Sequence, residues 1–160
     1  MTAIQILSEQ SRHAWAHKWE SLRVVLEGVT EEEAAWQADC YAHEAQENGW
    51  PLPGTILWQV AHIEFCKRHY INLIRQRPDE DIVVVKRKHT KSFQEEFDRL
   101  KETQVEFESL LSSLCDDDLR GTVNGQTPLV EFLNMAIRHD VWHAGQISVL
   151  RRLWKFRRDT

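Results

Sequence analysis

Apolar residues recur at the three- and four-residue spacing of an α-helix through four long stretches of the chain, and this periodicity most constrains the fold. Between these stretches lie glycine, proline and acidic clusters, which interrupt helices. The four predicted helices cover approximately residues 2–28, 55–76, 92–114 and 127–156. Four long helices separated by short or medium breaks predict an all-α four-helix bundle.

Capping residues mark where the predicted helices begin. The residues whose side chains can cap the four N-termini are Thr2, Thr55, Ser92 and Thr127. Pro128 would then occupy the first position of the last helix. Thr30 begins another capping motif, which predicts an extra short helix that ends near Trp36. Residues 39–54 are expected to form the longest irregular stretch, and residues 82–85 an extended connector.

The composition fits a single domain over residues 1–160. Hydrophobic residues make up 42% of the chain and charged residues 28%, with six glycines and four prolines, which excludes disordered, collagen-like and proline-rich proteins. No apolar run approaches the roughly 18 residues of a membrane-spanning helix, and no signal peptide is recognisable. The three cysteines are widely spaced without a Cys-x-x-Cys pair, which fits a reducing compartment. We therefore expect a cytoplasmic protein with no membrane partner.

The formal net charge of −5 argues against a nucleic-acid partner. Basic residues nevertheless cluster near the C-terminus, at Arg151, Arg152, Lys155, Arg157 and Arg158. The favoured interpretation is a solvated helix end whose cations complement the negative end of the helix dipole. The alternative is a patch that binds an anionic ligand. The basic residues 86–88, in a predicted loop, receive the same interpretation.

The eight histidines of the chain include one pair with a specific pattern. His139 and His143 stand one helical turn apart in Arg-His-Asp-Val-Trp-His-Ala-Gly-Gln-Ile, a spacing that puts both rings on one face, about 6 Å apart. The helical projection places both inside the apolar stripe that contains Phe132 and Ile147. Two imidazoles in the interior of a bundle need partners, because unsatisfied buried polar groups are costly.

His62 supplies a third imidazole from the core-facing side of the second predicted helix, between Trp58 and Phe65. With His139 and His143 it would form a three-histidine site whose fourth position is open to water or substrate, the pattern of catalytic metal sites. Such ligands suit zinc, nickel, iron or copper. The alternative is that His62 is a hydrogen-bonded core residue and that the protein binds no metal.

The other histidines compete less well for this role. His13 and His17 have the same spacing but point away from the apolar stripe of the first helix, so we expect them to be exposed. His69 follows His62 and Cys66 in a His-x-x-x-Cys-x-x-His run, which makes His69 a competing ligand. Cys66 lies nearer the edge of the inward-facing arc and is interpreted as a small buried thiol. The two histidines in predicted loops are His43 and His89.

Two motifs resemble one known family. Gly-Thr-Ile-Leu-Trp-Gln-Val-Ala-His-Ile in the second predicted helix is followed by His-Asp-Val-Trp-His-Ala-Gly-Gln-Ile in the last one, 77 residues later when counted from His62 to His139. This arrangement resembles the DinB/YfiT-like superfamily of damage-inducible proteins. The tryptophan-containing segment 31–36 also appears in the expected order, so the resemblance covers nearly the whole chain.

The resemblance implies a four-helix bundle with a divalent-metal site. Carried over by position, the ligands are His62, His139 and His143. Gly145 would permit the close approach of a helix, and Gln146 would support the ligands or pack beside them. The resemblance also implies a homodimer formed through the helices.

A metal held by three histidines can lower the pKa of bound water to near 7 or activate a thiolate or a carbonyl. Related proteins include thiol-dependent S-transferases and isomerases that use low-molecular-weight thiols, and metal-dependent hydrolases. We therefore expect a metal-dependent enzyme of the S-transferase or hydrolase type that acts on a small molecule, with zinc, nickel or iron as the metal and a low-molecular-weight thiol as a candidate cofactor. The alternative is a non-catalytic metal-binding protein with a stress-response interaction role. Asp140 and Gln146 are expected to support the ligands, whereas Glu64 points away from them and is left out of the site.

Overall fold

The computed structural model describes residues 1–19, 21–44, 50–75 and 92–157. The helices in these ranges are α1 (Ala3–Ala16), α2 (Leu22–Leu26), α3 (Glu31–Ala35), α4 (Ile56–Ile74), α5 (Phe93–Ser113) and α6 (Leu129–Phe156). They are joined by the 3-10 turns Asp39–Tyr41 and Asp118–Arg120 and by a hairpin of β1 (Thr122–Val123) and β2 (Thr127–Pro128). None of the described helices is long and apolar enough to cross a membrane.

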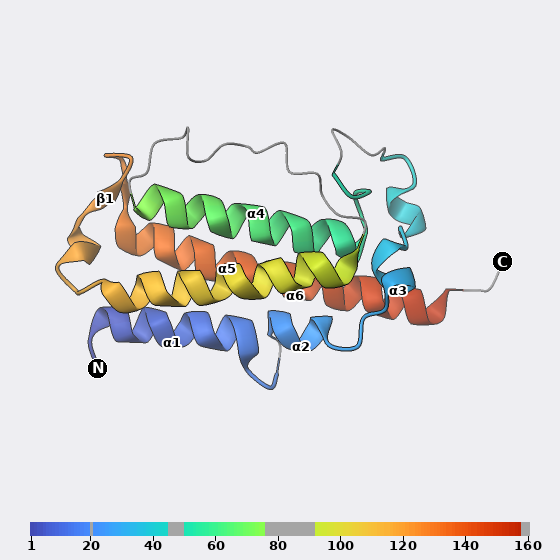
Figure 1. Ribbon diagram of the computed structural model, residues 1–160, viewed down its shortest axis with the longest axis horizontal. Coiled ribbons are helices and arrows are strands. Elements are labelled where there is room, and N and C mark those ends of the chain that lie inside the picture. The colour runs from blue at the N-terminus through green and yellow to red at the C-terminus, as the bar shows by residue number, and fades with distance from the viewer. Residues whose placement is uncertain (20, 45–49, 76–91, 158–160) are drawn as a thin grey trace.

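The long helices form four rows that lie alongside one another (Figure 1). α4, α5 and α6 make three rows, and α1 and α2 lie end to end in the fourth. α4 packs against both α5 and α6, and α1 does the same from the other side of the bundle. The predicted all-α four-helix bundle is therefore confirmed. The predicted extra short helix is α3, where the Thr30 side chain accepts a hydrogen bond from the backbone N–H of Glu33.

The first predicted helix is wrong in one respect, because the chain leaves the helical conformation between α1 and α2. His17 has extended dihedral angles (φ −67°, ψ 144°) at the end of α1. The hydroxyl of Ser21 then donates to the carbonyl oxygen of His17 at 2.6 Å, just before α2 begins. Trp19, which the apolar periodicity placed in the core stripe, is 66% exposed in this break.

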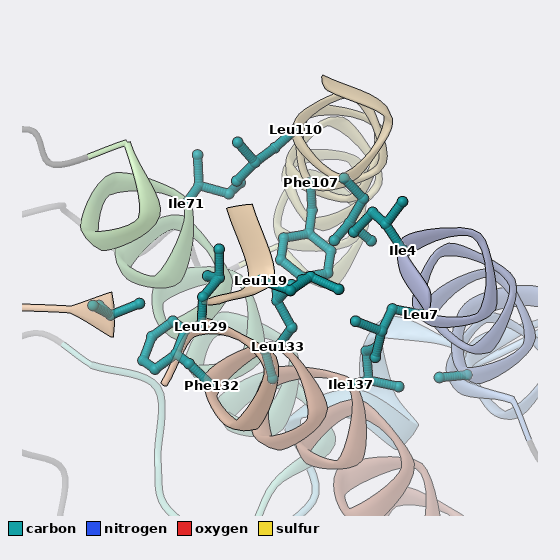
Figure 2. Packing of buried hydrophobic residues seen from close by; sticks show 14 residues of the cluster. Ile4, Leu7, Ile71, Phe107, Leu110, Leu119, Leu129, Phe132, Leu133 and Ile137 are labelled. Carbon is teal, nitrogen blue, oxygen red and sulfur yellow. The ribbon is translucent and has the colours of Figure 1, made fainter. Parts of the chain in front are cut away.

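The core consists of two clusters of buried side chains along the bundle. Figure 2 shows the first, in which Ile4 and Leu7 of α1, Phe107 of α5 and Leu133 of α6 converge. The second cluster lies further along the bundle and includes residues of α2, α4 and α6, among them Leu22, Ile63 and Ile147. Together the clusters hold α4 and α6 in contact along the segments that carry the candidate ligands.

The start of α6 also differs from the prediction. Thr127 pairs with Val123 in the hairpin, and α6 begins after Pro128 without a side-chain cap. Asn124 and Gly125 both have positive φ (53° and 66°), a conformation that suits an Asn-Gly turn. Because Thr127 is used in strand pairing, it does not cap α6, and the helix begins one residue later than predicted, at Leu129.

The basic C-terminal cluster is only partly a solvated helix end. Arg151 donates from Nε to Glu33 at 2.9 Å and from Nη1 to the carbonyl oxygens of Val25 and Glu27 at 3.0 and 2.9 Å. It therefore ties α6 to the α2–α3 segment. The expected connector at residues 82–85, the basic run 86–88, His89 and Arg158 lie outside the described residues.

Candidate metal centre

The three predicted ligands meet between α4 and α6. The ring centroids of His62 and His139 lie 5.3 Å apart, those of His62 and His143 5.0 Å, and those of His139 and His143 4.4 Å. His143 is buried, whereas His62 and His139 are half-buried. The two helices thus bring together three imidazoles, two of which retain access to solvent.

His143 is oriented by Gln59, a residue that the sequence analysis did not identify. Gln59 Oε1 makes a short hydrogen bond with Nδ1 of His143, and Gln59 is itself buried on α4. Because an amide oxygen only accepts, Nδ1 carries the proton and Nε2 keeps its lone pair. Nε2 lies 3.0 Å from Nε2 of His139. In the sequence, Gln59 could have been found from the spacing Gln-x-x-His, which places it on the same face of α4 as His62.

The environment keeps these imidazoles neutral. Burial, reinforced by the neighbouring His139, lowers the pKa of His62 from 6.5 to about 4. Burial and the other two rings lower the pKa of His143 to about 3, although the Gln146 side chain opposes this shift. Burial also lowers the pKa of His139, and the positive charge of Lys67 adds to the effect. At neutral pH all three rings therefore offer the unprotonated nitrogen that a metal requires.

Aromatic side chains surround the imidazoles. Trp58 stacks on His62 with the ring centroids 4.8 Å apart and the planes 6° from parallel. Tyr70 meets His139 edge-on at 5.8 Å, and the Trp142 ring lies 4.9 Å from that of His143. These rings restrict the rotation of the imidazoles and shield their faces from water.

Cys66 lies beside the candidate ligands His62 and His139. Its interpretation as a simple buried thiol therefore needs correction. One ligand atom from each of His62, Cys66 and His139 lies within 4.8 Å of the others. The Cys66 sulfur is 3.5 Å from Nε2 of His62. Burial raises the pKa of the Cys66 thiol to about 11, while a hydrogen bond from Tyr70 acts in the opposite direction. Among the described residues, His69 is not part of this metal-capable group.

Asp140 and Gln146 occupy different positions around the imidazoles. Asp140 is buried and accepts a hydrogen bond from Nζ of Lys67 at 2.5 Å, and Lys67 also donates to Gln104 at 2.5 Å. Burial raises the pKa of Asp140, and the charge of Lys67 opposes that shift. Asp140 therefore bears on the site through Lys67, whose charge acts on His139, whereas Gln146 acts on His143 directly.

The structure also places the residues that were left outside the site. His13 and His17 are exposed, as predicted. Glu64 is buried and accepts hydrogen bonds from Arg68 and Thr103, which directs it towards α5. Gly145 is exposed, and a Cβ added there would meet no atom of another described element within 4 Å, so no described helix makes the close approach that its motif predicts.

The donor set is compatible with a divalent metal ion. In a tetrahedral site with zinc–nitrogen bonds of roughly 2.0–2.1 Å, two nitrogen ligands lie about 3.3 Å apart. The Nε2 atoms of His139 and His143 lie 3.0 Å apart, so they need to separate only slightly to share such an ion. Imidazole nitrogens and a thiol favour zinc, nickel or iron over calcium or magnesium, which prefer oxygen ligands.

Comparison with known proteins identifies the family of this fold. The model of the DinB superfamily matches residues 14–147, a range that contains His62, Cys66, His139 and His143. Neither a curated protein nor a solved structure matches the chain significantly. Because the family match extends over most of the bundle and all of the candidate centre, the chain belongs to the DinB superfamily.

Proposed function

We propose that this protein binds one divalent metal ion through His62, His139 and His143 and uses it to act on a small molecule. The observation that carries the proposal is the approach of three neutral imidazoles from two helices, with the Nε2 atoms of His139 and His143 3.0 Å apart. Neutral imidazoles brought together in a partly buried site supply nitrogen lone pairs at little further cost in desolvation.

The proposed reaction is of the thiol S-transferase or hydrolase type. A bound zinc, nickel or iron ion would supply Lewis-acid activation of a thiol or of water. The protein's own contribution is orientation and exclusion of water: Gln59 fixes the ring of His143, and Trp58 and Tyr70 cover His62 and His139. A small-molecule substrate and a low-molecular-weight thiol are part of this proposal.

The alternative function is metal binding without turnover, in a stress-response interaction. One observation favours it, namely that the Cys66 sulfur lies 3.5 Å from Nε2 of His62. A sulfur ligand could occupy the position that a catalytic site leaves open. The two functions differ in whether an external ligand reaches the metal.

We also propose a cytoplasmic location and a homodimer, without a nucleic-acid partner. The three cysteines are free, which suits a reducing compartment, and the net charge is −5, which disfavours binding to nucleic acid. Exposed apolar residues along α6, including Val141, Val149 and Leu153, support association with a second copy.

Elemental analysis of protein purified without a histidine tag tests the metal site. We expect about one metal ion per wild-type chain and its loss in each of the single variants His62→Ala, His139→Ala and His143→Ala. His69→Ala is the matched control and should retain the metal. Full metal content in any of the three ligand variants would contradict the proposed ligand set.

Turnover assays separate the enzyme from the alternative. The metal-loaded protein is offered thiol acceptors and esters, and His143→Ala should abolish any turnover that the wild type shows. Metal binding without turnover, and without displacement of a metal-bound water by azide or a small thiol, would favour the non-catalytic function.

A further inference from the structure

We propose that Cys66 is a fourth ligand of the metal ion, so that the resting centre has three nitrogen ligands and one sulfur ligand. This inference rests on the metal site proposed above and concerns how that site is completed. Cys66 stands one helical turn after His62 on α4, which puts its sulfur beside the imidazole instead of on a separate face.

The distance between Cys66 and His62 matches that expected between two ligands of one tetrahedral ion. With zinc–sulfur and zinc–nitrogen bonds of about 2.3 and 2.05 Å, a sulfur and a nitrogen ligand lie about 3.6 Å apart. The sulfur of Cys66 is 3.5 Å from Nε2 of His62. His139 joins the same group, in which the ligand atoms lie within 4.8 Å of one another. His143 lies next to this group, because its Nε2 atom is 3.0 Å from Nε2 of His139.

Tyr70 gives the sulfur the outer partner that metal-bound thiolates commonly have. Its hydroxyl donates a hydrogen bond to Cys66, and its ring meets His139 and Phe132 of α6 edge-on. Tyr70 belongs to α4 and is thus also packed against α6. Groups that hydrogen-bond to ligands orient them and tune the metal. The other two cysteines, Cys40 and Cys115, are exposed.

A sulfur ligand changes what the centre can do. When the sulfur–metal bond forms, the thiol proton passes to solvent, and the thiolate fills the fourth position of a tetrahedral ion. An external thiol or water must then displace Cys66 or raise the coordination number to five. A thiolate also favours softer borderline ions such as zinc over manganese or magnesium.

Cobalt substitution tests this ligand directly. Metal-free, tag-free full-length protein is titrated with Co²⁺ under reducing conditions, and the absorption spectrum is recorded. We expect the visible bands of bound cobalt together with a near-ultraviolet thiolate-to-cobalt charge-transfer band. Cys66→Ser should lose the charge-transfer band, whereas the matched variant Cys115→Ser should keep it.

The double variant Cys40→Ser/Cys115→Ser leaves Cys66 as the sole thiol and must also keep the band, which preserves the test if Cys66→Ser fails to fold. Visible cobalt bands without a charge-transfer band, or a band that survives in folded Cys66→Ser, would overturn the role of Cys66 and leave the histidine site standing. If the wild type binds no cobalt at all, the proposed metal site itself fails and this inference fails with it.

Discussion

At the scale of single residues, Gln59 shows how one buried amide can set the chemistry of the centre. Its Oε1 accepts a hydrogen bond from Nδ1 of His143 on the neighbouring helix, which leaves Nε2 with its lone pair as the ligand atom. The grouping of the three histidines was predictable from the sequence, because their residue type and their helical spacing are both visible there. Gln59 was not, because glutamine is not a typical metal ligand and its partner lies 84 residues further along the chain.

Gln59→Leu removes this orientation and should weaken zinc binding by about 10- to 100-fold, the usual effect of losing an outer partner of a ligand. Competition with a chromophoric chelator measures the affinity. Gln94→Leu, at an exposed position on α5, is the matched control and should bind zinc as the wild type does. Equal affinities in Gln59→Leu and the wild type would show that Gln59 does not position His143.

The lowered pKa values of His62 and His143 predict that the metal-free protein loses stability as the pH falls from 7 to 5. In this range the unfolded chain takes up protons near pH 6.5, whereas the folded rings stay neutral because their pKa values are about 4 and 3. Each ring can contribute at most about 1.4 kcal/mol per pH unit, and the half-exposed His62 contributes less because solvent screens it.

Urea unfolding at pH 7 and pH 5 measures this loss. The double variant His62→Gln/His143→Gln removes two of the three rings with lowered pKa values and should reduce the pH dependence to the part that His139 contributes. A wild-type free energy of unfolding that is constant between the two pH values would show that the rings are not kept neutral by folding.

At the scale of elements, Lys67 links three helices through one buried charge. It donates from α4 to Gln104 on α5 and to Asp140 on α6, and the side chains of Lys67 and Asp140 are both 3% exposed. The helices themselves followed from capping residues and periodicity, as at Thr30, Thr55 and Ser92. The break before α2 could not be predicted in this way, because the apolar spacing continues through Trp19 although Trp19 is exposed and lies outside the core.

Lys67→Met strands the carboxylate of Asp140 in the core and should lower the free energy of unfolding by about 3–5 kcal/mol. The double variant Lys67→Met/Asp140→Leu removes both charges and should recover much of that loss. Lys101→Met breaks an exposed pair with Asp98 on α5 and should leave the free energy of unfolding nearly unchanged, because solvent screens an exposed ion pair. Urea denaturation measures all three, and a Lys67→Met protein as stable as Lys101→Met would exclude the proposed link.

At the scale of the whole molecule, the bundle leaves an apolar face of α6 exposed. Trp142, Val149 and Phe156 are 62%, 54% and 83% exposed, and Gly145 lies between them with open space above its Cα. Gly145 makes no close contact with another helix of the described residues, and we propose a second copy as the partner for the approach that its motif predicts. The homodimer remains a prediction, which rests on this exposed apolar face of α6.

Val149→Lys should therefore convert a dimer into a monomer, because each copy would bury an unpaired charge in the shared interface. Val105→Lys makes the same substitution at a 68%-exposed position on α5 and should leave the dimer intact. Light scattering coupled to size exclusion measures the mass against the 18.9 kDa of one chain. A monomeric wild type, or a Val149→Lys dimer, would rule out α6 as the interface.

Whether one divalent ion is bound where His62, His139 and His143 meet can be measured by anomalous diffraction from crystals of the full-length protein grown with zinc. We expect one strong anomalous peak between α4 and α6, with ring nitrogens of these histidines at roughly 2.0–2.1 Å from the ion. A crystal whose strongest peak lies at the exposed pair His13 and His17, with none among the three predicted ligands, would contradict this expectation.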